Sequence, residues 1–266
     1  MSRICCDWSK LCPDVLGSIL ERLSTKDFHR ARSVCSNWYS VSVSRTSMRQ
    51  LYPWRILFNK ENSTLLFDPG EEKTHEIQHH PEIDFSKKYV MDSCSNWLLL
   101  VDSTLEFFLL NVFTGERINL PSMESFIRGK EDGKEEWVDY IQHANVSIFS
   151  KSSVAAVLWM DERTGDYVVA WCYKQHYLFS YKKGDDSWCN LGSHKCVSMA
   201  YKKSKLYVFT SEHYIKILDL SGDYPNEIIE GNPYRNHRFE FVLQPGEFIW
   251  MKKVAITNSG EVLIVV

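Results

Sequence analysis

The chain lacks the segments that direct a protein into a membrane or into the secretory pathway. None of its apolar runs approaches the ~20 residues that a membrane-spanning helix needs. The first seven residues, MSRICCD, contain no apolar core of a secretory signal and are too short for a transit peptide. We therefore expect no contact with a membrane, and a location in the cytoplasm or nucleus.

The sequence also lacks the motifs of common cofactor and metal sites. Its eight cysteines form no CxxC pair and show no zinc-finger spacing, so free thiols are expected in a reducing compartment. Neither GxGxxG, a Walker motif, GxSxG nor an EF-hand loop occurs. We predict no cofactor, no bound metal and no catalytic residues.

One literal match to a catalytic signature remains. His75-Glu76-Ile77-Gln78-His79 fits HExxH, in which a helix places two zinc-binding histidines on one face with the glutamate as general base. Pro69 and Pro81 flank this segment, and no apolar helical stripe surrounds it, so a β-strand is favoured. A zinc metalloprotease using His75, Glu76 and His79 is the remote alternative function.

Charge is divided unevenly along a chain whose net charge is −3. Residues 1–60 contain ten Lys and Arg against four Asp and Glu, whereas residues 61–266 contain 21 against 30. A basic N-terminal region predicts an acidic partner, because complementary charge speeds encounter and selects partners. Nucleic acid is not expected as that partner, since no base-reading motif accompanies the positive charges and the whole chain is acidic.

Residues 11–46 have the apolar periodicity of short helices. Pro13 suits the first position of a helix, and Ser24 with Asp27 has the spacing of a capping box at the start of a second one. The stripe of the first helix is formed by Val15, Leu16, Ile19, Leu20 and Leu23. Three short helices in about 35 residues bury too little apolar surface to stand alone, which predicts a partner. The alternative is a helical subdomain packed on the rest of the same chain.

The segment LCPDVLGSILERLSTKDFHRARSVCSNW, residues 11–38, resembles an F-box. This resemblance implies a substrate-recognition subunit of an SCF-type (cullin-RING) ubiquitin ligase, which binds a Skp-type adaptor, through it a cullin, and an unknown protein substrate. Such a subunit is not itself an enzyme. The positions that match F-box packing or adaptor contact are Leu11, Pro13, Leu16, Ile19, Leu20, Val34 and Trp38.

After Trp54 the pattern changes to short apolar runs and a period of two, which is typical of β-strands. The predicted strands are 64–67, 97–101, 105–112, 154–160, 167–173, 206–210, 214–220 and 262–266. Thr114-Gly115 and Thr164-Gly165 are among the turn signals between them. Units beginning near Trp97, Ser153, Val197 and Lys252 follow one another at intervals of about 45 to 55 residues, near the period of a propeller blade. A sandwich of similar strands is the alternative.

Three segments of this half, LLNVFTGERINLP, KLYVFTSEHYIKILDL and KKVAITNSGEVLIVV, resemble in their order the kelch-like β-propeller of a plant F-box family, domain of unknown function 295. In that family further strands follow the last segment, whereas this chain stops at Val266. The expected fold is mainly β with a small all-α head, a three-helix F-box followed by an incomplete propeller of roughly four to five blades.

The expected domains are the F-box at 8–45, a linker at 46–62 and the β-propeller at 63–266. The alternative function is a binding protein outside any ligase, or a truncated decoy that engages only the adaptor.

Overall fold

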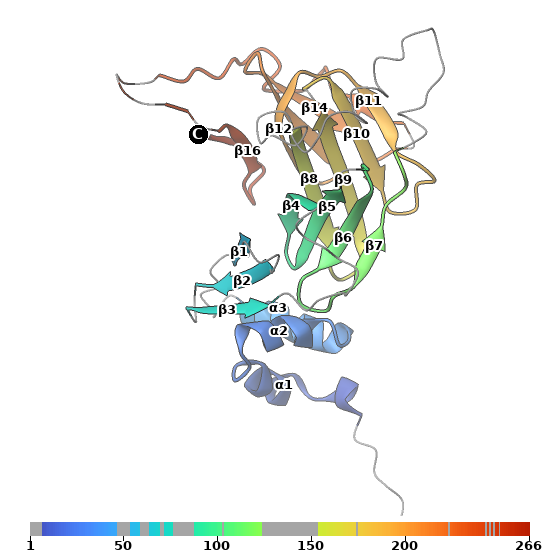
Figure 1. The fold of residues 1–266 in the computed structure, drawn as a ribbon, viewed down its shortest axis with the longest axis vertical. Helices are drawn as coiled ribbons and strands as arrows, with labels where there is room; N and C mark the ends of the chain where they lie inside the picture. The colour runs from blue at the N-terminus through green and yellow to red at the C-terminus, as the bar shows by residue number, and fades with distance from the viewer. Residues whose placement is uncertain are drawn as a thin grey trace, which may run out of the picture. The chain divides into compact units, whose positions relative to one another are not determined.

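In the computed structural model the chain forms two compact units (Figure 1). One unit contains residues 1–88 together with 110–118 and 162–164, and the other contains the remainder. The residues that the structure describes are 7–46, 54–58, 64–69, 72–76, 88–102, 104–123, 154–173, 175–222, 224–242, 244, 246, 248–249 and 251–266.

The first unit begins with the predicted helices. A short 3-10 helix, Trp8–Lys10, precedes α1 (Pro13–Leu20), α2 (Thr25–Arg32) and α3 (Ser36–Thr46). Among the helices described, none combines the length and the apolar composition needed to cross a bilayer.

A three-stranded antiparallel sheet follows the helices, with strands β1 (Arg55–Phe58), β2 (Thr64–Asp68) and β3 (Lys73–Glu76). Strand β1 lies inside the range 46–62 that we expected to be a linker, and it pairs with β2 from Arg55 opposite Phe67 to Phe58 opposite Thr64. β-Structure in this chain therefore begins before residue 63.

Four further sheets are each formed by strands that are consecutive in the sequence. The first has β4 (Lys88–Cys94), β5 (Trp97–Asp102), β6 (Phe107–Asn111) and β7 (Arg117–Asn119). The second has β8 (Val154–Asp161), β9 (Asp166–Tyr173), β10 (Tyr177–Lys182) and β11 (Cys189–Gly192). The third has β12 (Cys196–Lys202), β13 (Lys205–Thr210), β14 (Ile215–Asp219) and β15 (Asn226–Glu227), and the last has β16 (Lys253–Ile256) and β17 (Val262–Val265).

These sheets confirm the predicted mainly-β fold with a helical head. Each of the eight predicted strands is found, with ends within two residues of the expected ones. The four repeat units correspond to the four sheets that begin with β4, β8, β12 and β16. Sheets of consecutive strands are the arrangement of propeller blades, whereas the strands of a sandwich pass between two sheets.

Glycine allows two of the predicted turns to close. Gly115 and Gly165 have φ of 76° and 70°, in the left-handed region that side chains with a Cβ rarely adopt. The Gly115 N–H donates to the Asn111 carbonyl at 2.9 Å, and the Gly165 N–H to the Asp161 carbonyl at 2.7 Å. Thr114-Gly115 therefore joins β6 to β7, and Thr164-Gly165 joins β8 to β9, as the turn signals in the sequence indicated.

Apolar side chains, and hydrogen bonds between residues far apart in the sequence, hold neighbouring sheets of the second unit together. Strand β5 is buried along its whole length. A core cluster joins β8, β9 and β10 to β12, β13 and β14 and includes the fully buried Leu178, Leu206 and Val208. The buried Trp188 indole N–H donates to the Pro121 carbonyl at 2.7 Å, so the ring is packed without leaving its polar group unpaired.

A carboxylate also bridges two sheets of this unit. Asp92 in β4 accepts the backbone N–H of Leu158 in β8 at 2.7 Å through Oδ2. Burial raises the pKa of Asp92, although the hydrogen bonds from the Leu158 and Ser93 backbone and the charge of Lys253 oppose the shift.

We predict that this carboxyl makes folding less favourable as the pH rises. Because its pKa is raised above the usual 3.8, the folded chain holds a proton there that the unfolded chain has released, and stability falls from pH 3.8 upward through the raised pKa. Asp92→Asn keeps an oxygen acceptor for the Leu158 N–H and should remove this decline. Urea unfolding across that pH range measures the effect.

Asp219 provides the control with the opposite sign. Hydrogen bonds from Ser221 lower the pKa of Asp219, so its contribution is present above pH 3.8 and is lost as the pH falls. Asp219→Asn should therefore lower stability at neutral pH relative to acid pH. If Asp92→Asn instead shows the same pH dependence as the wild type, burial of the Asp92 carboxyl does not control stability.

Candidate functional site

Helix α1 begins at Pro13, a residue type that suits the first turn of a helix. Cys12 is the N-cap, and Pro13 occupies the first turn, where a backbone N–H would have no partner within the helix. Asp14 adds a negative charge to the same turn, which favours the positive end of the helix dipole. The helix then presents Leu16 and Leu20 to the centre of the module, where both side chains are fully buried.

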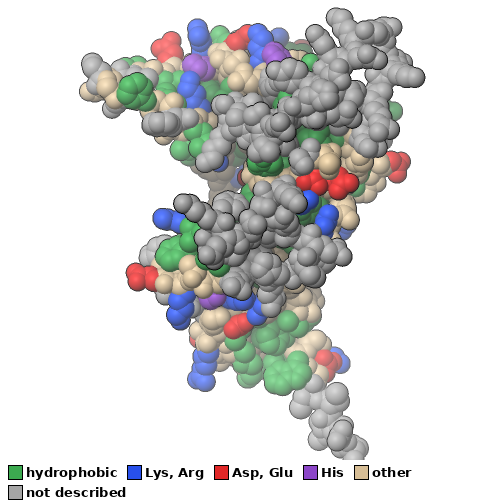
Figure 2. All heavy atoms as spheres, viewed as in Figure 1, with side chains coloured by type: hydrophobic (Ala, Val, Ile, Leu, Met, Phe, Trp, Pro, Cys, Tyr) green, Lys and Arg blue, Asp and Glu red, His purple; other side chains and the backbone are tan. Residues whose placement is uncertain are grey.

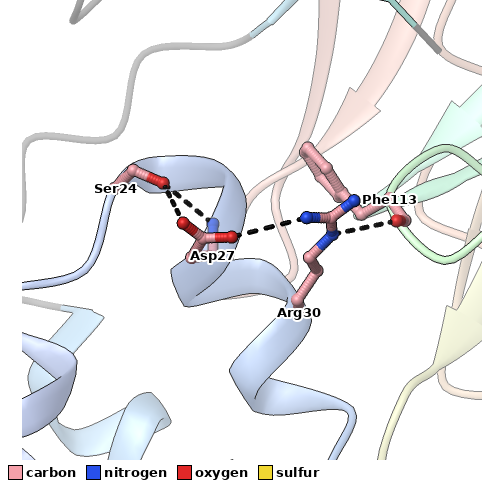
Figure 3. Close-up of polar contacts among 4 residues, drawn as sticks. All are labelled: Ser24, Asp27, Arg30 and Phe113. Carbon is pink, nitrogen blue, oxygen red and sulfur yellow. Dashed lines mark hydrogen bonds and ion pairs between the residues drawn. The ribbon is translucent and has the colours of Figure 1, made fainter. Parts of the chain in front are cut away.

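The second helix begins with Ser24 as its N-cap, at the position that the sequence predicted. The Ser24 hydroxyl accepts the Asp27 backbone N–H at 3.1 Å and donates to Asp27 Oδ2 at 2.9 Å (Figure 3). This pair fixes the start of α2 after the break at the end of α1. Such a cap stabilises a helix by about 1 kcal/mol.

A small apolar core joins the three helices. It consists of Leu16, Leu20, Phe28, Ala31 and Val41. Leu11, Leu23 and Trp38 are partly buried against it. Full burial of one leucine contributes about 1.5–3 kcal/mol, so these few side chains give the head a modest stability of its own.

Side chains of helix α3 form hydrogen bonds with the backbone of the segment that precedes α1. The Asn37 side-chain amide donates to the carbonyls of Ser9 and Leu11, both at 3.0 Å. The Trp38 indole N–H donates to the Trp8 carbonyl at 3.0 Å. We did not predict a role for Asn37 or Trp8, because a single polar residue in a helical pattern gives no sign of which backbone it binds.

The side of α2 that carries its basic residues is covered by other residues of the same unit. His29 stacks on Phe113 with ring centroids 4.9 Å apart. Arg30 Nε donates to the Phe113 carbonyl at 3.3 Å (Figure 3). Arg32 forms an ion pair with Glu162 at 3.0 Å, with both side chains largely buried. Trp54 packs edge-on against Phe113 at 5.0 Å. This side of α2 is thus occupied within the chain.

Elsewhere the helical head exposes apolar side chains. Figure 2 shows hydrophobic side chains on the surface of this region. The exposed fraction is 62% for Trp8, 49% for Val15, 61% for Val34 and 48% for Val43. A module of this size cannot cover all its apolar groups, and these remain accessible to a partner.

The structure divides the seven predicted site residues between core and surface. Leu16 and Leu20 are fully buried and can only support the fold. Leu11, Ile19 and Trp38 are half-buried, whereas Pro13 and Val34 are exposed. Val15, which we had placed in the apolar stripe but not among the site residues, is also exposed.

The HExxH segment has strand geometry where the structure describes it. His75 and Glu76 lie in β3, which pairs with β2, and the His75 ring stacks on Trp54 at 5.3 Å. Ile77, Gln78 and His79 lie outside the described residues. Within the described part of the chain, no three His, Cys, Asp or Glu side chains are grouped to hold a metal ion.

In the comparison with known proteins, two family models match separate parts of the chain. Residues 8–49 match the family model described as F-box domain, and residues 66–266 match the model described as KIB1-4 beta-propeller.

Three proteins of Arabidopsis thaliana are similar over nearly all of the chain. One described as an F-box protein is 61% identical over 100% of this chain and 70% of its own length. F-box only protein 7 is 46% identical over 97% and 69% of the two chains, and F-box protein KIB4 is 34% identical over 95% and 67%. The predicted plant F-box and β-propeller are confirmed, and the chain belongs to the F-box proteins that carry a KIB1-4 β-propeller.

Proposed function

We propose that this protein is a substrate receptor of an SCF-type ubiquitin ligase. The F-box module would bind a Skp-type adaptor and through it a cullin, while the β-domain would hold a client protein. The observation that carries this proposal is the helical head, because it has an F-box sequence and leaves Trp8, Val15 and Val34 exposed on a small folded core.

The adaptor contact would be formed by the exposed residues and not by the whole predicted set. The centre of the contact would be formed by the exposed Pro13, Val15 and Val34. Its edge would be formed by the half-buried Leu11, Ile19 and Trp38. Leu16 and Leu20 would act indirectly, by holding α1 in place against α2 and α3. The excess of basic residues near the N-terminus would favour an acidic adaptor surface.

The mechanism would be one of proximity. F-box proteins in general act as adaptors and not as enzymes. Binding of a client beside a ubiquitin-charged enzyme raises the effective concentration of its lysines without a catalytic group on the receptor.

We expect Val34→Glu to weaken adaptor binding at least roughly tenfold, because it would place a charge in a desolvated apolar contact. Val34 is 61% exposed, so the thermal unfolding of the chain should change little. Isothermal titration with purified Skp-type adaptor measures the affinity. Val265→Glu is the matched control, since Val265 is 56% exposed in β17 and should leave this affinity unchanged. Equal affinities for the two variants would remove Val34 from the proposed contact.

Leu16→Ala tests the supporting role of the core. Because Leu16 is fully buried, its truncation should lower the free energy of unfolding of the head by about 2–5 kcal/mol. Adaptor binding should fall only in proportion to the unfolded fraction of the head, which hydrogen exchange over 13–46 reports. A loss of affinity with unchanged protection of α1 would show instead that Leu16 contacts the adaptor directly.

The full receptor function is tested with client proteins in cells. Immunoprecipitation of the tagged chain after proteasome inhibition should recover adaptor, cullin and proteins whose abundance rises with the inhibitor. Val34→Glu should lose adaptor and cullin together while it retains the clients. Recovery of adaptor alone by the wild-type chain would contradict the receptor role and support a decoy.

A further inference from the structure

A cluster of basic side chains surrounds the turn between β13 and β14, in a part of the sequence that is acidic overall. Glu212 and His213 form this turn, and Lys195 pairs with Glu212. The hydrogen bond and charge of Lys195, followed by the charges of Lys216 and Arg238, lower the pKa of Glu212. One carboxylate is thus shared among several cations. Figure 2 shows Lys, Arg and His side chains along the top of the view, with Asp and Glu side chains among them.

Lys252 is held in this cluster by uncharged partners. Its Nζ lies 2.8 Å from His213 Nε2 and 4.4 Å from the centroid of the Phe241 ring. Burial, and then the charges of Lys252 and Arg238, lower the pKa of His213, so its imidazole is neutral near pH 7 and Nε2 can accept a hydrogen bond from the Lys252 ammonium. The contact occupies one of three N–H donors on Lys252.

The positive charge of this cluster is only partly compensated. Lys195 pairs with Glu212, and Lys216 pairs with Glu227 at 3.5 Å. Among the residues that the structure describes, no carboxylate lies within ion-pair distance of Lys252 or Arg238. Lys252 contacts the His213 ring, and Arg238 precedes Phe239, whose backbone N–H donates to the His213 carbonyl. Two cations close to a neutral imidazole favour an anion at this place.

Backbone and aromatic contacts hold the cluster in shape without a ligand. His213 has φ of 67°, an unusual value for a residue with a side chain, and its carbonyl accepts the Phe239 N–H at 2.9 Å. Its ring stacks on Phe209 at 5.9 Å and meets the edge of Phe241 at 5.1 Å. A site that is already ordered loses less entropy when a ligand binds.

We infer that the Lys252 site, formed by His213, Arg238, Phe241 and Lys252, binds an acidic segment of the client protein. Carboxylates of the segment would accept from Lys252 and Arg238, and an apolar side chain between them would pack on Phe241 and on Val242, which is 91% exposed. This inference rests on the proposed function, because it assigns the chemistry by which the β-domain recognises a client.

An acidic protein segment fits these residues better than a nucleic acid does. Residues 61–266 contain 21 Lys and Arg against 30 Asp and Glu, and so large a negative excess opposes a polyphosphate backbone beyond the cluster itself. A phosphoryl group is commonly recognised by several arginines, whereas the Lys252 site contains one, Arg238, which precedes the Phe239 that is hydrogen-bonded to His213.

The test uses the full chain and two labelled peptides of about ten residues. One contains glutamates around a central leucine, and the other has every glutamate replaced by glutamine. Fluorescence anisotropy should show tighter binding of the glutamate peptide, weakening as salt is added. Lys252→Met keeps an unbranched side chain beside Phe241 and should weaken this binding roughly tenfold, as expected for the loss of one charge-assisted hydrogen bond.

Lys183→Met is the matched control. The Lys183 side chain is 49% exposed, and its Nζ lies 4.0 Å from Asp166 Oδ1 in the sheet of β8 to β11, which does not contribute to the Lys252 site. This substitution should leave the affinity for the glutamate peptide within about twofold of wild type. Arg238→Gln provides a second variant on an exposed residue if Lys252→Met unfolds at a lower temperature.

Three results would overturn the inference. They are equal affinity for the two peptides, equal effects of Lys252→Met and Lys183→Met, and tighter binding of a ten-base DNA than of the glutamate peptide. Adaptor titration of the same samples separates this inference from the proposed function. If the chain binds adaptor but does not prefer the glutamate peptide, the proposed receptor role stands and the proposed role of the Lys252 site in client binding is excluded.

Discussion

The packing of α1 against α2 and α3 is the contact on which the proposed function depends. Leu16 and Leu20 from α1 meet Phe28 from α2 and Val41 from α3 in a core of few residues. Because this core is small, it leaves apolar side chains such as Val34 outside it. The small size of the core therefore has two consequences, because it makes the head only modestly stable and leaves an apolar surface accessible. An F-box that did not fold could not present that surface to an adaptor.

Local signals in the sequence predicted most elements of the fold. Pro13 and the Ser24–Asp27 cap mark the helix starts, and glycine marks the turns that follow β6 and β8. Several strands were missed, among them β1, β4, β10 and β12. Four residues, as in β1, are too few for a period of two to be distinguished from a linker. The pattern of Leu16, Leu20 and Val34 indicated apolar helices, but not which of these side chains the neighbouring helices would cover. That depends on the angles at which the helices pack.

The contacts that could not be predicted join residues that lie far apart in the sequence. Arg32 forms an ion pair with Glu162, and the Lys252 ammonium contacts the His213 ring, which is 39 residues away in the sequence. From the sequence alone, a single charged residue is interpreted as part of a solvated surface. Only the folded chain shows that it has a particular partner. The basic cluster around His213 is hidden for the same reason, since the surrounding sequence is acidic on average. In the proposed receptor, the apolar head and this basic site would bind different partners, which allows each to be tested without the other.

The central claim is that the helical head joins this chain to a ubiquitin ligase scaffold. It is tested most directly by mixing the purified chain with a Skp-type adaptor and a cullin and measuring the mass of the product by size-exclusion chromatography with light scattering. The account predicts a single species that contains one copy of each protein and that is lost with Val34→Glu. Separate elution of the folded wild-type chain, away from an adaptor–cullin pair that is itself intact, would contradict it.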